Sequence, residues 1–131
     1  MNNKSKGCNA ERELLHLFWN FGWACIRVAG SGSSRYPSPD LVASNKSRVL
    51  AIECKTSKNP KKYLKEEDVG QIKKFSSIFS AEPWIGIRFS GGDWYFIMCE
   101  DLKTSGSGFL IDKEVIRTKG LLFEEVIKNK K

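Results

Sequence analysis

The stretch PDLVASNKSRVLAIECK, residues 39–55, is the most informative part of this chain for its fold. Two apolar runs, 40–43 and 48–55, flank the polar turn 44–47, and this pattern predicts a β-hairpin. Side chains alternate along a strand, so Glu53 and Lys55 share one face and Leu50, Ile52 and Cys54 share the other. Asp40 opens the neighbouring strand, and the hairpin brings its carboxylate towards Glu53. The stretch therefore predicts two acids and a lysine gathered at one end of a hairpin.

The segments on both sides of the hairpin predict helices and further strands. Together they give the order α-β-β-β-α-β-β-α, an α/β fold in which helices flank a mixed central β-sheet. The 131 residues are a suitable length for a single domain spanning 1–131. The expected elements are a helix over 5–21, a strand over 23–29, a helix over 66–80, strands over 84–89 and 94–99, and a strand remnant with a final helix within 110–128; 30–38 and 57–65 are expected to be loops.

The positive charge is confined to the first half of the chain. The net charge is +7, but residues 1–65 carry +8 and residues 66–131 carry −1. A one-sided basic surface attracts polyanions such as nucleic acids. No apolar run is long enough to span a bilayer and the N-terminus lacks a secretory signal, so we expect a cytoplasmic protein without a membrane partner. Four dispersed cysteines and a single histidine disfavour a zinc site and Cys/His nucleophilic catalysis.

Glu11 is the acid of the first helix that needs an explanation. It shares a stripe with Leu14 and Phe18, which should face the sheet, and a carboxylate there needs a partner. Glu13 is about 200° away around the helix and can remain in water. Acids that converge from a helix and a hairpin repel one another unless a proton or cation lies between them, and oxygen ligands suit Mg²⁺.

Pro39-Asp40 followed by Glu53-Cys54-Lys55 matches the PD-(D/E)xK signature of metal-dependent nucleases with the restriction-endonuclease-like fold. The purely structural alternative makes Glu53 and Lys55 a surface pair of little energetic value and Asp40 a turn residue. That alternative must treat three features as separate coincidences: the place of the motif on a hairpin with the right alternation, Glu11 on the face turned to the sheet, and the basic first half of the chain. We therefore favour the nuclease interpretation.

Longer stretches resemble the archaeal Holliday junction resolvases over residues 4–100. These stretches are KGCNAERELL (6–15), GWACIRVAGSG (22–32), PDLVA (39–43), LAIECK (50–55) and VGQIKKFS (69–76). The resemblance implies a homodimer that nicks two strands of a four-way DNA junction symmetrically, using Mg²⁺ or, as a substitute, Mn²⁺. Glu11, Asp40 and Glu53 would then bind metal, and Lys55 and Ser31 would be catalytic.

The resemblance also implies contacts with DNA. Arg12 and Arg27 match basic residues near the scissile phosphate, and the further expected DNA contacts are Arg35, Lys58, Lys61 and Lys62. Ser33 and Ser34 compete with Ser31 for the catalytic serine, because the loop is longer than in some relatives. Whether one or two metal ions act is open.

Three alternatives remain at the level of function and assembly. The chain could be a nuclease that acts on duplex or flap DNA, or a junction-binding protein without catalytic activity. The strands 84–89 and 94–99, with Phe79, could form the homodimer interface or simply pack in the core. Other recombination proteins are possible partners.

Overall fold

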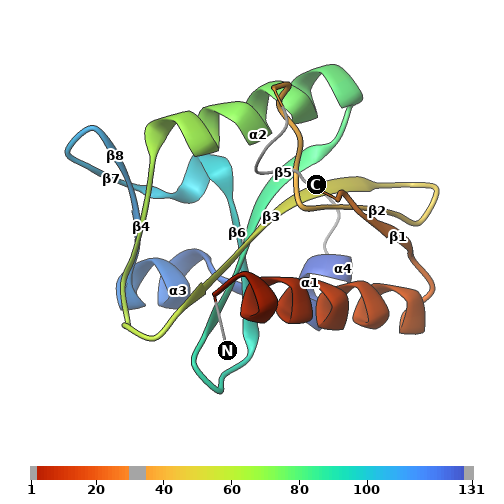
Figure 1. Cartoon of the computed structure of the whole chain (residues 1–131), viewed down its shortest axis with the longest axis horizontal. Coiled ribbons are helices and arrows are strands. Elements are labelled where there is room, and N and C mark those ends of the chain that lie inside the picture. The colour runs from red at the N-terminus through yellow and green to blue at the C-terminus, as the bar shows by residue number, and fades with distance from the viewer. Residues whose placement is uncertain (1–2, 30–34, 129–131) are drawn as a thin grey trace.

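The computed structural model describes residues 3–29 and 35–128, and its centre is a six-stranded sheet (Figure 1). The strand order is β1-β2-β3-β5-β6-β9, and every neighbouring pair is antiparallel except β3 and β5. The parallel pair confirms that the sheet is mixed. The strands are β1 (Ala24–Arg27), β2 (Leu41–Ser44), β3 (Val49–Ser57), β5 (Glu82–Phe89), β6 (Trp94–Met98) and β9 (Leu121–Leu122).

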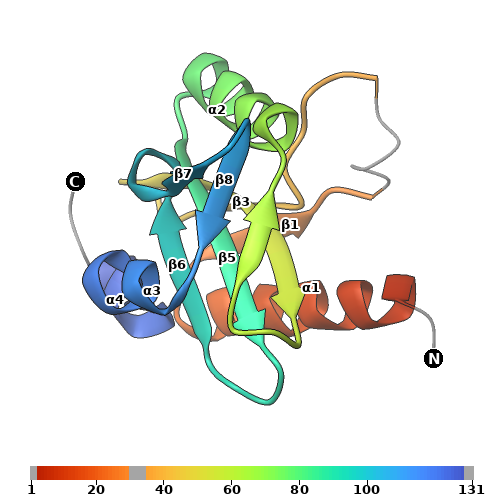
Figure 2. The ribbon, with the colours of Figure 1, turned by 90° about the vertical axis from the view of Figure 1, so that its left-hand side faces the viewer.

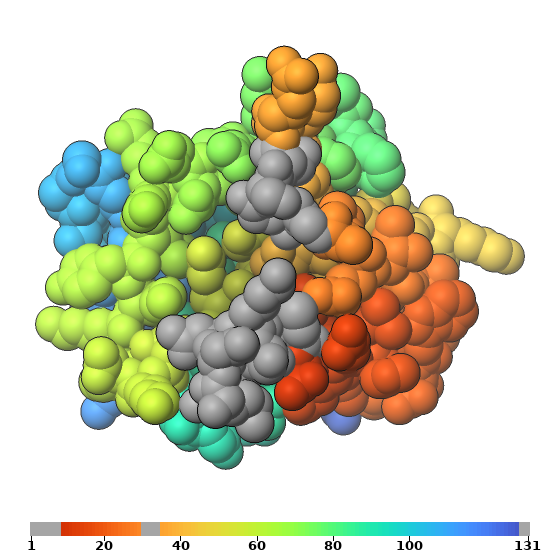
Figure 3. All heavy atoms as spheres, in the orientation of Figure 1, coloured from red at the N-terminus to blue at the C-terminus, as the bar shows by residue number. Residues whose placement is uncertain are grey.

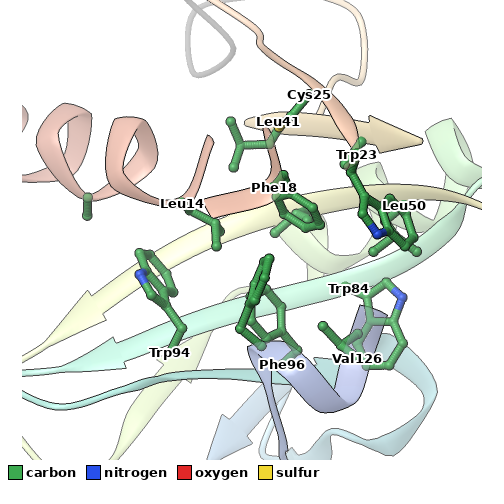
Figure 4. Packing of buried hydrophobic residues seen from close by; sticks show 14 residues of the cluster. Leu14, Phe18, Trp23, Cys25, Leu41, Leu50, Trp84, Trp94, Phe96 and Val126 are labelled. Carbon is green, nitrogen blue, oxygen red and sulfur yellow. The ribbon is translucent and has the colours of Figure 1, made fainter. Parts of the chain in front are cut away.

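Helices cover both faces of this sheet, as predicted. In Figure 1 helix α2 (Glu66–Phe79) lies above the sheet and α1 (Asn3–Asn20) lies below it. The core on the α1 side also includes Phe123 and Val126 of α4 (Phe123–Lys128). Figure 4 shows Leu14 and Phe18 directed from α1 towards Trp94 and Phe96 of β6. Among the helices of residues 3–29 and 35–128, none combines the length and the apolar character that a membrane span requires.

A second, three-stranded sheet lies beside α2 and is the main difference from the predicted order. It has the order β4-β8-β7, formed by β4 (Lys62–Leu64), β8 (Gly108–Ile111) and β7 (Lys103–Ser105) (Figure 2). The expected loop 57–65 therefore contains a strand, and the chain between 99 and 120 adds η2 (Cys99–Asp101), β7, β8 and α3 (Lys113–Lys119). Strands of three or four residues that pair over long sequence separations have too little periodicity to be recognised locally.

The two strands considered for a dimer interface lie in the core of the chain. Trp84, Ile85 and Ile87 of β5 and Phe96 and Ile97 of β6 are at most 2% exposed. The core alternative is therefore confirmed for these strands. Phe79 differs, because it lies at the end of α2 and is 52% exposed.

Candidate active site

The register of the β2–β3 hairpin brings Asp40 opposite Glu53. Leu41 pairs with Ile52, and one step earlier the Asp40 amide donates to the Ile52 carbonyl at 3.0 Å. Because β2 begins at Leu41, no carbonyl of β2 accepts a hydrogen bond from the Cys54 amide. The Asp40 Oδ2 accepts that amide at 2.8 Å, and Asp40 is only 9% exposed. The site therefore begins where β3 continues past the start of β2.

Glu53 and Lys55 project from the same face of β3, as the alternation predicts. Lys55 Nζ lies 3.8 Å from Glu53 Oε2 and 4.0 Å from Asp68 Oδ2, which belongs to the first turn of α2. Leu50 and Ile52 are buried on the opposite face, in the core beneath α1. The lysine is thus held between one carboxylate from the sheet and another from a helix.

The electrostatic environment of Glu53 opposes its ionisation. Burial, and after it the nearby charge of Asp40, raise its pKa from 4.5 to about 8. Lys55 lowers the pKa of Glu53, while Asp68 and, more weakly, Glu11 raise it. A carboxyl group poised between its neutral and charged forms near neutral pH is typical of functional sites. A bound cation would favour the charged form of Glu53 and so lower this pKa.

Glu11 finds the partner that its place on α1 requires, and that partner is Arg27 of β1. Arg27 Nε donates to Glu11 Oε1 at 2.9 Å, and both side chains are partly buried. Burial and the charge of Asp40 raise the pKa of Glu11, whereas Arg27 and Arg12 lower it. Glu13 is exposed, as predicted, and forms an ion pair with Arg88 of β5.

The acids are close enough to affect one another's pKa but do not form a complete metal cage. Among residues 3–29 and 35–128, no three His, Cys, Asp or Glu side chains are placed so that they could hold a metal ion. Mg²⁺ is commonly bound by one or two carboxylates together with water and substrate oxygens. The opposed acids Asp40 and Glu53 fit that donor set, and Glu11 would have to turn from Arg27 to join them.

The remaining predicted residues are not all at this site. Ser31, Ser33 and Ser34 lie outside the described residues. Arg12 is exposed on α1, and exposed Arg35 lies over the Tyr36 ring at 5.6 Å. Lys58 and Lys61 are exposed between β3 and β4, and Lys62 is partly buried in β4.

Asp68 is the residue of this site that the sequence analysis did not identify. The acids Glu66, Glu67 and Asp68 in the first turn favour the start of a helix electrostatically and indicate nothing more by themselves. Its relation to Lys55 depends on how α2 packs against β3, which the sequence pattern does not define. Three acids at a helix start indicate a helix, but they do not indicate the contact between Asp68 and Lys55.

Comparison with known proteins gives one consistent answer. A family model described as archaeal Holliday junction resolvase (hjc) matches residues 2–131, well beyond the 4–100 recognised from motifs. The chain is 41% identical over 112 residues to the crossover junction endodeoxyribonuclease Hjc of Archaeoglobus fulgidus, covering 86% of this chain and 82% of that protein. It is 41% identical over 122 residues to the enzyme of the same name from Methanocaldococcus jannaschii, covering 93% and 86%.

Solved structures agree with the sequence matches. The crystal structure of Archaeoglobus fulgidus Hjc, a Holliday junction resolvase, superposes with a TM-score of 0.86 at 39% identity. That superposition covers 91% of this chain and 96% of the other. It confirms the mixed α/β architecture with its flanking helices. Since the family model and the relatives extend over most of its length, this chain belongs to the archaeal Holliday junction resolvase family.

Proposed function

We propose that this protein is a Mg²⁺-dependent endonuclease, a single nuclease domain that resolves four-way DNA junctions by paired, symmetric nicks. The observation that carries the proposal is the opposition of Asp40 and Glu53 beside Lys55. A pKa of about 8 at Glu53, caused by burial and by Asp40, marks a site where negative charge lacks compensation. The family to which the chain belongs, and the names of its relatives, support the choice of junction DNA as the substrate.

The side chains have separate roles in this proposal. Asp40 and Glu53 would hold the metal ion, with Glu11 as a third ligand. A bound Mg²⁺ supplies Lewis acidity, lowering the pKa of a bound water and neutralising charge on the phosphate oxygens. The Lys55 ammonium adds positive charge where the transition state is most negative. Ser31 is proposed as a further catalytic residue.

Arg27 has a structural role in addition to its proposed contact near the scissile phosphate. Its guanidinium holds Glu11 at 2.9 Å and keeps that carboxylate oriented in a partly buried position. Arg12, whose charge also lowers the pKa of Glu11, is exposed and can face DNA. A homodimer would present two such sites, because a two-fold protein matches two equivalent cuts across a pseudo-two-fold junction.

The proposal is tested by cleavage of a labelled, immobile four-way junction in the presence of Mg²⁺, beside a duplex of the same sequence. Paired nicks in the junction alone, abolished by EDTA, are expected. Asp40→Asn should lose cleavage while junction binding persists, because the amide keeps the shape but not the charge. Glu124→Gln, an exposed acid on α4 outside the site, is the matched control and should cut normally.

Other outcomes would overturn parts of the proposal. Equal cutting of duplex and junction would leave a nuclease without junction selectivity. Cleavage by Asp40→Asn at the wild-type rate would remove Asp40 from the metal site. Tight junction binding with no cleavage under any divalent ion would show a binding protein.

A further inference from the structure

The basic surface of this protein extends beyond the N-terminal half that carries the excess charge. A hollow of about 540 Å³ lies between the β3–β4 connection, the β5–β6 turn and α3. We call it the α3 hollow. Its three basic residues are Lys58 from the connection and Lys113 and Arg117 from α3. Two of these three cations come from the half of the chain whose net charge is −1.

These three cations are not neutralised within the protein. Among the described residues, no carboxylate lies within 4.0 Å of any of them, although other basic side chains of the second half are paired. Lys103 pairs with Asp112 at 2.7 Å, and Lys119 lies 3.9 Å from Asp101. Asp93 is the one acidic residue that lines the α3 hollow, which leaves it a net charge of +2.

The walls of the α3 hollow suit a sugar–phosphate backbone. Partly buried Phe89, Tyr95 and Ile116 give it an apolar surface beneath exposed Lys113 and Arg117. The two cations are four residues apart and therefore lie on one side of α3. Apolar contacts to sugars combined with cations to phosphates give backbone contacts that position DNA without reading its sequence.

The α3 hollow adjoins a second hollow that is lined by residues next to Lys55 in the chain. A second hollow of about 750 Å³ is lined by Thr56 and Ser57, the two residues that follow Lys55 on β3. Both hollows share Lys58, Phe89 and Ser90, so they adjoin. Figure 3 shows α1 in red and the segment after β3 in yellow-green on one face, with the β5–β6 turn in blue-green at its lower rim.

We propose that the α3 hollow binds the phosphodiester backbone of the DNA arm that leaves the catalytic site. This inference rests on the proposed function for the identity of the DNA. Lys58 would link the phosphates next to Lys55 with those held by Lys113 and Arg117. The contact is independent of base sequence and should contribute to affinity and to its dependence on salt.

The test is the salt dependence of binding, measured by fluorescence anisotropy of a labelled four-way junction in EDTA. Lys113→Gln/Arg117→Gln removes two phosphate contacts, so the slope of log K against log salt should fall in magnitude by about 1.8. At about 0.1 M salt the affinity should drop roughly 10- to 60-fold. Lys119→Gln/Lys128→Gln carries the same charge change outside the hollow and should keep the wild-type slope.

The length of the arms provides an independent criterion. When the arms are trimmed to a few base pairs, the phosphates proposed to reach the α3 hollow are absent, and the difference between the variant and the wild type should disappear. A difference that persists with trimmed arms would overturn the assignment to the arm. Equal slopes for the two double variants would overturn the site itself.

Different results would contradict the α3 hollow and the junction-cleaving activity. A wild-type protein that does not cut junctions, or binds them no better than duplex, contradicts the proposed function. The slope difference between the two double variants is measured without metal or cleavage, on a long duplex as well as on the junction. It therefore supports or overturns the α3 hollow whatever the result with Mg²⁺.

Discussion

Glu53→Gln should make the metal-free protein more stable at alkaline pH, although it removes a group proposed to be essential for activity. Burial and Asp40 raise the pKa of Glu53 from 4.5 to about 8, while the unfolded chain keeps the ordinary value. Between these two values the folded protein binds more protons than the unfolded one. The free energy of unfolding therefore falls as the pH rises through this window, and the loss is largely complete above pH 8.

The size of the effect follows from the two pKa values. A tenfold change in the ionisation equilibrium corresponds to about 1.4 kcal/mol, so the interval from 4.5 to about 8 gives roughly 3–5 kcal/mol. The side chain keeps 22% of its exposure, so partial solvation places the effect at the lower end of that range. Gln keeps the shape of the side chain without its charge. The variant should gain this stability at pH 8.5 and little of it at pH 5.

Urea denaturation of the wild type and Glu53→Gln at pH 5 and pH 8.5, in EDTA, measures the difference. Exposed Glu67→Gln on α2 is the matched control and should follow the wild type at both values. Added Mg²⁺ should stabilise the wild type, because a ligand that binds only the folded state favours it, and should leave Glu53→Gln nearly unchanged. A variant no more stable than the wild type at pH 8.5, or a gain of the same size at pH 5, would contradict a raised pKa at Glu53.

Three further predictions follow from other parts of the structure. Asp68→Asn should lower the cleavage rate about two- to fivefold in single-turnover assays without changing junction affinity, because it removes one of the two carboxylates that flank Lys55. An unchanged cleavage rate would show that the contact between Asp68 and Lys55 is dispensable. Arg48→Gln should lower the free energy of unfolding by roughly 2–4 kcal/mol in urea titration, because Arg48 binds Glu82 through two nitrogens at 2.8 and 2.9 Å and is 11% exposed. A loss below about 1 kcal/mol would contradict a stabilising role of this ion pair. Cys25 and Cys99 should not react with a thiol reagent at pH 8 until the protein unfolds, because burial raises the pKa of both thiols to about 12. Peptide mapping locates the modified cysteines, and rapid modification of either one in the native protein would be inconsistent with that burial.

The order of the main elements follows from local patterns that need no knowledge of distant contacts. The alternation in residues 49–55 defines which side chains share a face of β3, and the polar turn before it defines the hairpin. The stripe of Leu14 and Phe18 defines the buried face of α1 in the same way. These features were predictable because their periodic patterns of apolar residues extend over several consecutive residues.

The small sheet was not predictable by the same means. Strands β4 and β8 each have three or four residues and come from positions more than 40 residues apart, so neither has a pattern of its own. Their pairing depends on the packing of the chain around α2. The position of the α3 hollow depends on the same packing, which is why Lys113 and Arg117 carried no signal in the sequence.

Local sequence patterns indicated the chemical content of the candidate site: which acids and which lysine share an end of the hairpin, and that Glu11 lies on the face of α1 turned to the sheet. The partners of these side chains depend on the tertiary structure. It placed Arg27 against Glu11, Asp68 beside Lys55, and Asp40 on the Cys54 amide. Local periodicity acts over a few residues, whereas ion pairs and pKa shifts depend on distances between elements, and those distances are set by how helices pack on a sheet.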